Sequence, residues 1–116
     1  MNFRYRSATV EDAAVLAPMN AQLIRDEGHR NPMTMLQLQE RLSDWLKGEY
    51  QAFLFELDAR VIGYALYRIE PEFVYLRQIF VLPELRRRGI ARAALEWLGR
   101  NAPPCQYDVR HLPLTN

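Results

Sequence analysis

The sequence predicts an α/β protein with a mixed, mostly antiparallel sheet and helices on both of its faces. Three observations support this fold class. Apolar residues recur at helical spacing before Gly48 and at a spacing of two after it, so helices precede a run of strands. Two tight turns, at 58–60 and 70–72, join the strands of that run into consecutive antiparallel hairpins. A strand, a helix and a strand at the C-terminal end favour a parallel, right-handed crossover.

The first half of the chain predicts one strand and two helices. Aromatic side chains alternate with arginines over residues 3–6, which indicates a short first strand. Thr9, with an acidic residue three positions on, resembles a capping box and begins a helix that runs to about Glu27. Thr34 caps a second helix, in which apolar residues recur at helical spacing until Gly48 ends it.

The second half predicts three strands, a helix and a last strand. Period-two patterns indicate strands at Gln51–Leu57, Val61–Ile69 and Phe73–Leu82. An amphipathic helix follows over about residues 88–101, and two prolines stop it. The last strand is expected at Cys105–Arg110.

Composition narrows the class of protein. The 116 residues are expected to form one domain, residues 1–116. The sequence is 49% hydrophobic and 25% charged, which is typical of a globular protein. A net charge of +1 argues against a dedicated nucleic-acid binder. The single cysteine, Cys105, excludes an internal disulfide and fits a reducing compartment. No apolar run reaches the length of a membrane span and no signal peptide is recognisable, so we expect a cytoplasmic protein with no membrane partner.

The turn between the last hairpin strand and the following helix carries the strongest functional signal. Arg86–Arg88 and Gly89 follow Pro83 and lie at or just before the helix N-terminus. That end of a helix is electropositive, because its first N–H groups are unpaired and the helix dipole points there. Cations and a glycine there oppose stability unless an anion binds, so the turn predicts a small-anion site. Two alternatives stay open: a solvated arginine run, and a nucleic-acid contact through Arg86, Arg87, Arg88 and Arg92.

Residues 86–91 read Arg-Arg-Arg-Gly-Ile-Ala and resemble the acyl-coenzyme-A signature of the GNAT N-acetyltransferase superfamily, Gln/Arg-x-x-Gly-x-Gly/Ala. The order of predicted elements is also similar to that fold through its fifth strand, and residues 5–13 look like the family's opening. The resemblance implies that amides of a bulged fourth strand hold the pantetheine arm and the thioester carbonyl, while the arginine-rich turn and the next helix hold the pyrophosphate. The coenzyme-binding residues that it implies are Ile79, Phe80, Val81, Arg86, Arg87, Arg88, Gly89, Ile90, Ala91 and Arg92.

The resemblance also implies a reaction, in which an amine of a small molecule or peptide attacks the thioester of acetyl-CoA directly and no metal takes part. A general base must accept the amine proton. Candidate bases are Asp108, Glu72 and Glu70, and for each the alternative is a solvated surface carboxylate. The predicted catalytic residues are Asp108, Glu72 and Tyr75.

Other polar residues are candidates for the acceptor side. Tyr75, with Tyr64 and Tyr67, lines an acceptor pocket or packs in the sheet with a satisfied hydroxyl. Arg77 and Gln78 interrupt an apolar strand, and such an exception often marks a functional site. The alternative is that Arg77 pairs with a neighbouring carboxylate and Gln78 forms hydrogen bonds with the backbone.

The connection after the first helix is a further candidate for the acceptor wall. Asp26, Glu27 and His29 lie there, and acidic groups in that place would suit a cationic amine. A charged helix end on the surface is the alternative.

The sequence departs from the family at its C-terminal end. Members normally add a helix, which carries a tyrosine that acts as general acid, and two further strands, but this sequence stops at Asn116. We therefore expect a C-terminally truncated form of the fold, with a homodimer covering the open edge of the last strand. The alternative function is a catalytically weak or inactive acyl-CoA-binding or regulatory domain.

Overall fold

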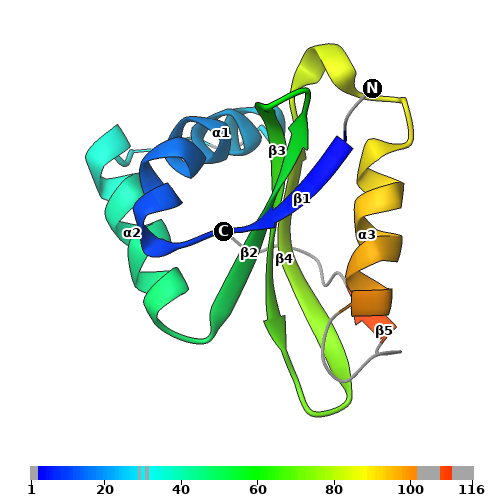
Figure 1. Ribbon diagram of the computed structural model, residues 1–116. Coiled ribbons are helices and arrows are strands. Elements are labelled where there is room, and N and C mark those ends of the chain that lie inside the picture. Colours follow the sequence, from blue (N-terminus) through cyan, green and yellow to red (C-terminus); the bar gives the residue numbers. More distant parts are fainter. Residues whose placement is uncertain (1–2, 29, 31, 102–107, 111–116) are drawn as a thin grey trace.

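A computed structural model of the protein describes residues 3–28, 30, 32–101 and 108–110 (Figure 1). The strands are β1 (Phe3–Ser7), β2 (Tyr50–Leu57), β3 (Arg60–Ile69), β4 (Phe73–Val81) and β5 (Asp108–Arg110). They form one five-stranded sheet in the order β1-β2-β3-β4-β5. The first four strands pair antiparallel with their neighbours, whereas β5 pairs with β4 in parallel.

Helices cover both faces of the sheet. They are α1 (Ala13–Asp26), α2 (Met35–Lys47) and α3 (Ile90–Asn101), with short 3-10 turns η1 (Val10–Asp12) and η2 (Pro83–Leu85). Figure 1 shows α1 and α2 against one face and α3 against the other. The predicted fold class, a mixed and mostly antiparallel sheet with helices on both faces, is confirmed. Among the described residues, no helix has the length and apolar character that crossing a bilayer requires.

The helix starts follow local side-chain chemistry. Thr34 and Gln37 form a reciprocal capping box at α2: the Thr34 hydroxyl accepts from the Gln37 amide at 3.1 Å, and the Gln37 side chain accepts from the Thr34 amide at 2.8 Å. α3 begins at Ile90, two residues later than the sequence predicts. Arg87 and Gly89 have φ values of 65° and 78°, which a right-handed helix cannot include.

Two apolar cores hold the layers together. The α1–α2 core includes Leu16, Leu38, Leu42, Leu54, Tyr64 and Phe80. The α3 core includes Phe53, Phe55, Val74, Leu76, Ala94 and Leu98. Each sheet strand that contributes to both cores does so by the alternation of its side chains between the two faces.

One glycine is required by a close approach of two strands. A Cβ at Gly63 of β3 would lie 2.2 Å from the Phe80 carbonyl oxygen and 2.9 Å from Cδ2 of Phe55. Contacts that short force a backbone or a buried ring to move. Gly63 therefore allows β4 to pair closely with β3 at the end of β4 that leads into the arginine-rich turn.

We expect Gly63→Ala to lower the free energy of unfolding by about 2 kcal/mol, the usual scale for overpacking a filled interior. The measurement is urea-induced unfolding. Gly48→Ala is the matched control, because its Cβ would lie 3.5 Å from the Asp44 carbonyl, an ordinary contact. Equal stability of the two variants would contradict this account of the β3–β4 contact.

Candidate functional site

β4 carries a bulge in its middle. The β3–β4 register shifts between Leu66 and Tyr67, and this shift leaves Arg77 with no residue opposite it. An extra residue of this kind turns the side chains that follow it to the other face of the sheet. Leu76 consequently packs in the α3 core, whereas Phe80 packs in the α1–α2 core.

Within the described part of the chain, the outer edge of β4 is open over its second half. β5 pairs with β4 only from Phe73 to Tyr75. Beyond Tyr75, no strand that the structure describes lies on that side of β4. Peptide groups that face this edge are therefore available to a ligand, as in β-strand recognition generally.

Alternation along β4 decides which peptide groups face the open edge. The Phe80 carbonyl lies against Gly63 of β3, and the Leu82 amide donates to Ile62 of β3 at 2.9 Å. Successive residues of a strand direct their peptide groups to opposite edges. Of the three predicted amides, those of Ile79 and Val81 therefore face the open edge, while that of Phe80 faces β3.

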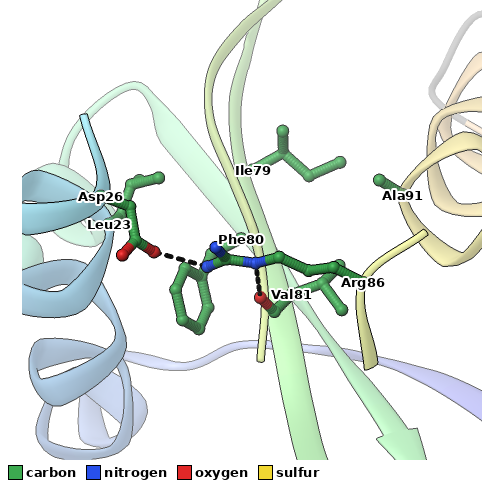
Figure 2. A pocket seen from close by; sticks show the side chains of 7 residues that line it. All are labelled: Leu23, Asp26, Ile79, Phe80, Val81, Arg86 and Ala91. Atoms are coloured by element: carbon green, nitrogen blue, oxygen red, sulfur yellow. Dashed lines mark hydrogen bonds and ion pairs between the residues drawn. The ribbon is translucent and has the colours of Figure 1, made fainter. Parts of the chain in front are cut away.

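A pocket of about 220 Å³ lies where this edge meets α1 and the start of α3 (Figure 2). It is lined by Leu23, Asp26, Ile79, Phe80, Val81, Arg86 and Ala91. Five of these seven residues are among the predicted coenzyme-binding residues, and the structure brings them together from β4, the turn and α3. The other two, Leu23 and Asp26, come from α1.

Arg86 crosses the pocket and links its two walls (Figure 2). Its Nε donates to the Val81 carbonyl at 2.8 Å, and a terminal nitrogen donates to Asp26 Oδ2 at 2.5 Å. The guanidinium also lies 5.3 Å from the centre of the Phe80 ring. Hydrogen bonds from Arg86 and then from Gln22 hold the pKa of the Asp26 carboxyl below its usual value.

The turn after Arg86 presents its backbone to open space. Gly89 has positive φ, and no atom lies within 4 Å of the position that a Cβ would occupy there. α3 starts at the next residue, where the Ala93 amide donates to the Gly89 carbonyl at 2.9 Å. The N–H groups of Ile90, Ala91 and Arg92 belong to the first turn, which has no intrahelical acceptor for them. Arg87, Arg88 and Arg92 are exposed. This end of α3 combines free donors, positive charge and an unobstructed approach, which suits an anion.

Two of the predicted catalytic residues lie far from this pocket along β4. Glu72 is exposed in the β3–β4 turn, and the backbone of Asp108 pairs with Phe73. At about 3.3 Å per residue, Phe73 and Ile79 are about 20 Å apart along the strand. Tyr75, half-buried, is the nearest of the predicted catalytic residues, and Arg68 lies 5.2 Å from the centre of its ring.

Other acceptor-side candidates have partners inside the protein. Glu70 forms an ion pair with Arg68. The Tyr67 hydroxyl donates to Gln51 at 3.2 Å, and burial raises the pKa of the Tyr67 hydroxyl. His29 lies outside the described residues.

Tyr64 and Gln78 belong to a buried polar network that sequence patterns did not predict. Asn20 of α1 donates to the Tyr64 hydroxyl at 3.2 Å and to Gln78 Oε1 at 3.0 Å. The Tyr64 hydroxyl donates to the same Gln78 oxygen at 2.9 Å, and Arg41 donates to Asn20 Oδ1 at 3.0 Å. Tyr64, Asn20 and Gln78 are all buried, and burial raises the pKa of the Tyr64 hydroxyl. The sequence feature that could have indicated this network is Asn20, a polar residue at helical spacing within the apolar stripe of α1.

Comparisons with known proteins agree with this fold. A family model described as the acetyltransferase (GNAT) family matches residues 18–108. No curated protein matches the chain. Among solved structures, a possible acetyltransferase from Clostridium difficile 630 has a TM-score of 0.81 at 17% identity, covering 99% of this chain and 82% of its own.

Two further solved structures are similar in the same way. A predicted acetyltransferase with acetyl-CoA from Clostridium acetobutylicum has a TM-score of 0.76 at 18% identity, covering 97% of this chain and 81% of its own. A ribosomal-protein-alanine N-acetyltransferase from Brucella melitensis biovar Abortus 2308 has a TM-score of 0.76 at 18% identity, covering 97% of this chain and 82% of its own. The TM-scores establish the shared fold, and the family model covers most of the sequence. The protein belongs to the GNAT family of acetyltransferases.

Proposed function

We propose that this protein transfers an acetyl group from acetyl-CoA to an amine of a small molecule or peptide. The observation that carries this proposal is the pocket between the open edge of β4 and the start of α3, which Arg86 crosses. The pantetheine arm of the coenzyme requires partners for its amide groups, and the strand-edge peptide groups provide them. The diphosphate requires hydrogen-bond donors and positive charge, which the free N–H groups at the start of α3 and the arginines provide.

The proposed coenzyme contacts follow from the geometry. Ile79 offers its peptide N–H and carbonyl at the open edge to the pantetheine amides and the thioester carbonyl, and Val81 offers its N–H, because its carbonyl already accepts from Arg86. The ring of Phe80 forms an apolar wall. Gly89 leaves the diphosphate room to approach the backbone, and Arg86 supplies a guanidinium that can exchange its carboxylate partner for a phosphate.

In the proposed reaction the free amine nitrogen attacks the thioester carbonyl carbon. A C–N bond forms, the C–S bond breaks, and coenzyme A leaves as a thiolate that takes up one proton from the attacking nitrogen. An ammonium substrate must also release one proton before attack, so the net products are the amide, the free thiol and one proton. The roles of Glu72, Tyr75 and Asp108 in these proton transfers stay predictions.

Gly89→Glu should abolish coenzyme binding, because a side chain and a negative charge would occupy the proposed diphosphate position. The measurement is the rise in melting temperature that acetyl-CoA causes in the wild-type protein. Gly28→Glu is the matched control: Gly28 has φ of 77° against 78° at Gly89, and neither has an atom within 4 Å of its Cβ position. Both variants therefore carry similar backbone strain, and only Gly89→Glu should lose the response. Loss in both, or in neither, would count against this diphosphate site.

Asp26→Asn should tighten coenzyme binding by about fivefold, the scale of one like-charge contact in water. The carboxylate lies in the pocket and holds Arg86, so it both repels phosphates and competes with them for the guanidinium. The measurement is titration calorimetry with coenzyme A at low and high salt, and the gain should shrink at high salt. Glu11→Gln removes an exposed carboxylate from η1 as the control. Weaker binding in Asp26→Asn would mean that Asp26 orients Arg86 for the coenzyme.

Thiol release from acetyl-CoA, measured over a panel of amines, tests turnover itself. We expect release that depends on the amine and yields the acetylated product by mass spectrometry. Coenzyme binding without turnover on any amine would instead support an acyl-CoA-binding or regulatory domain.

A further inference from the structure

Two guanidinium groups meet on one indole ring beside the β4 bulge. Arg41 of α2 lies 4.6 Å from the centre of the Trp45 ring, and Arg77 of β4 lies 4.7 Å from it. Arg77 also lies 5.8 Å from the centre of the Tyr50 ring, and within the described part of the chain each arginine has one further polar contact. Arg41 donates to Asn20, and Arg77 makes a long contact of 3.4 Å to the Tyr50 hydroxyl.

Neither arginine has its charge compensated within the described part of the chain. No ion pair there includes Arg41 or Arg77, and the Nε of each is buried without a hydrogen-bond partner. These Nε atoms are closed to solvent, so a ligand can reach only the remaining N–H groups of the two half-buried side chains.

Other partly buried arginines in the structure show the usual solution. Arg6 pairs with Asp12 and Glu56, Arg68 pairs with Glu70, and Arg86 pairs with Asp26. The fold therefore supplies carboxylates to arginines where it needs them, and the Arg41–Arg77 pair is an exception. Two like charges that share a ring repel each other, and burial and then Arg77 lower the pKa of Arg41.

The position of the pair relates it to the proposed reaction. Arg77 is the bulge residue, two positions before Ile79, whose peptide group faces the open edge. Arg41 is held by Asn20, and Asn20 precedes Leu23 of the pocket by three residues, or about 4.5 Å of helix. Both arginines thus lie on the α1–α2 side of β4, where they contact Trp45 of α2, and Arg77 is two residues along the strand from the pocket residue Ile79.

We propose that Arg41 and Arg77 bind the oxyanion of the acetyl acceptor, so that the acceptor is a small amine that also carries a carboxylate or a phosphate. This inference rests on the proposed function. An oxyanion that reaches both half-buried side chains accepts from their terminal N–H groups and neutralises part of their charge. Asp26 does not oppose it, because its own charge is already paired with Arg86, but Glu40 and Asp44 line a cavity with Arg41, so the oxyanion must bind outside that cavity.

Trp45 provides a direct readout that requires no coenzyme. The chain has two tryptophans, Trp45 and Trp97, so a Trp97→Phe background leaves fluorescence from Trp45 alone. In that background, 4-aminobutanoate is titrated against 4-aminobutanamide, and O-phosphoethanolamine against ethanolamine. Each comparison keeps the amine and removes only the oxyanion, and the two oxyanions distinguish a carboxylate from a phosphate.

We expect at least one oxyanion to change Trp45 fluorescence and to bind about tenfold or more tightly than its neutral partner, the scale of a hydrogen bond to a charged group. Arg77→Gln should remove that preference, and Arg77→Lys should keep part of it. Arg60→Gln removes a surface arginine, whose side chain is 64% exposed, and should leave the preference unchanged. In acetyl-transfer assays, the amine that carries the preferred oxyanion should also have a higher kcat/KM than its neutral partner.

Equal binding of charged and neutral partners, or a preference that survives Arg77→Gln, would overturn the inference even where acetyl transfer occurs. Failure to bind acetyl-CoA would overturn the proposed function alone, because the Trp45 titration would still decide whether the oxyanion binds. Faster acetyl transfer to the neutral amines than to their oxyanion-carrying partners would also overturn the inference that Arg41 and Arg77 bind an oxyanion.

Discussion

The extra residue in β4 is the constraint on which the rest of the site depends. Side chains of a regular strand alternate between faces, so Leu76 and Phe80 would otherwise point to the same side of the sheet. The bulge at Arg77 separates them: Leu76 completes the α3 core, and Phe80 completes the α1–α2 core. Beyond the bulge, β4 keeps Phe80 on the α1–α2 face and directs the amides of Ile79 and Val81 to its open edge.

The buried network explains why the bulge stays in register. Gln78 is 2% exposed, and a buried amide is unfavourable unless its hydrogen-bonding groups are satisfied. Asn20 of α1 and Tyr64 of β3 both donate to its Oε1. A slip of β4 by one residue would remove Gln78 from both partners and put Arg77 or Ile79 in its place. The network thereby ties α1 to the bulge, and α1 also supplies Leu23 and Asp26 to the pocket.

The sequence predicted the order of the elements well, because that order depends on local signals. Changes of apolar period, capping residues and glycines or prolines all lie within a few positions of the boundary that they mark. The start of α3 was predicted too early, because the sequence does not indicate that Arg87 adopts a positive φ, which is rare for arginine. The predicted strand at Cys105–Arg110 is described over Asp108–Arg110, and residues 105–107 lie outside the described part.

The site was predicted unevenly for the same reason. The arginine-rich turn is contiguous, so its motif could be recognised, and five predicted residues do line one pocket. Asn20 and Arg41 were missed, since the importance of each depends on partners that are distant in the sequence, such as Gln78 at 58 positions from Asn20. Which of Ile79, Phe80 and Val81 faces the open edge depends on strand register, and so does the distance of Glu72 and Asp108 from the pocket. Arg77 and Gln78 were noticed as exceptions, but a strand pattern alone does not distinguish a bulge from a paired charge.

Charge at the acceptor side bears on how the amine loses its proton. With the proposed oxyanion bound, two guanidinium charges face one or two negative charges, and the carboxylate case leaves a net positive charge beside the bulge. A neighbouring positive charge favours a neutral amine over an ammonium, so it lowers the pKa of the acceptor nitrogen. That effect reduces the demand on a dedicated base, which matters because Glu72 and Asp108 lie at the far end of β4. Under the proposal, the same arginines that select the acceptor by its oxyanion also favour the protonation state in which its nitrogen can attack.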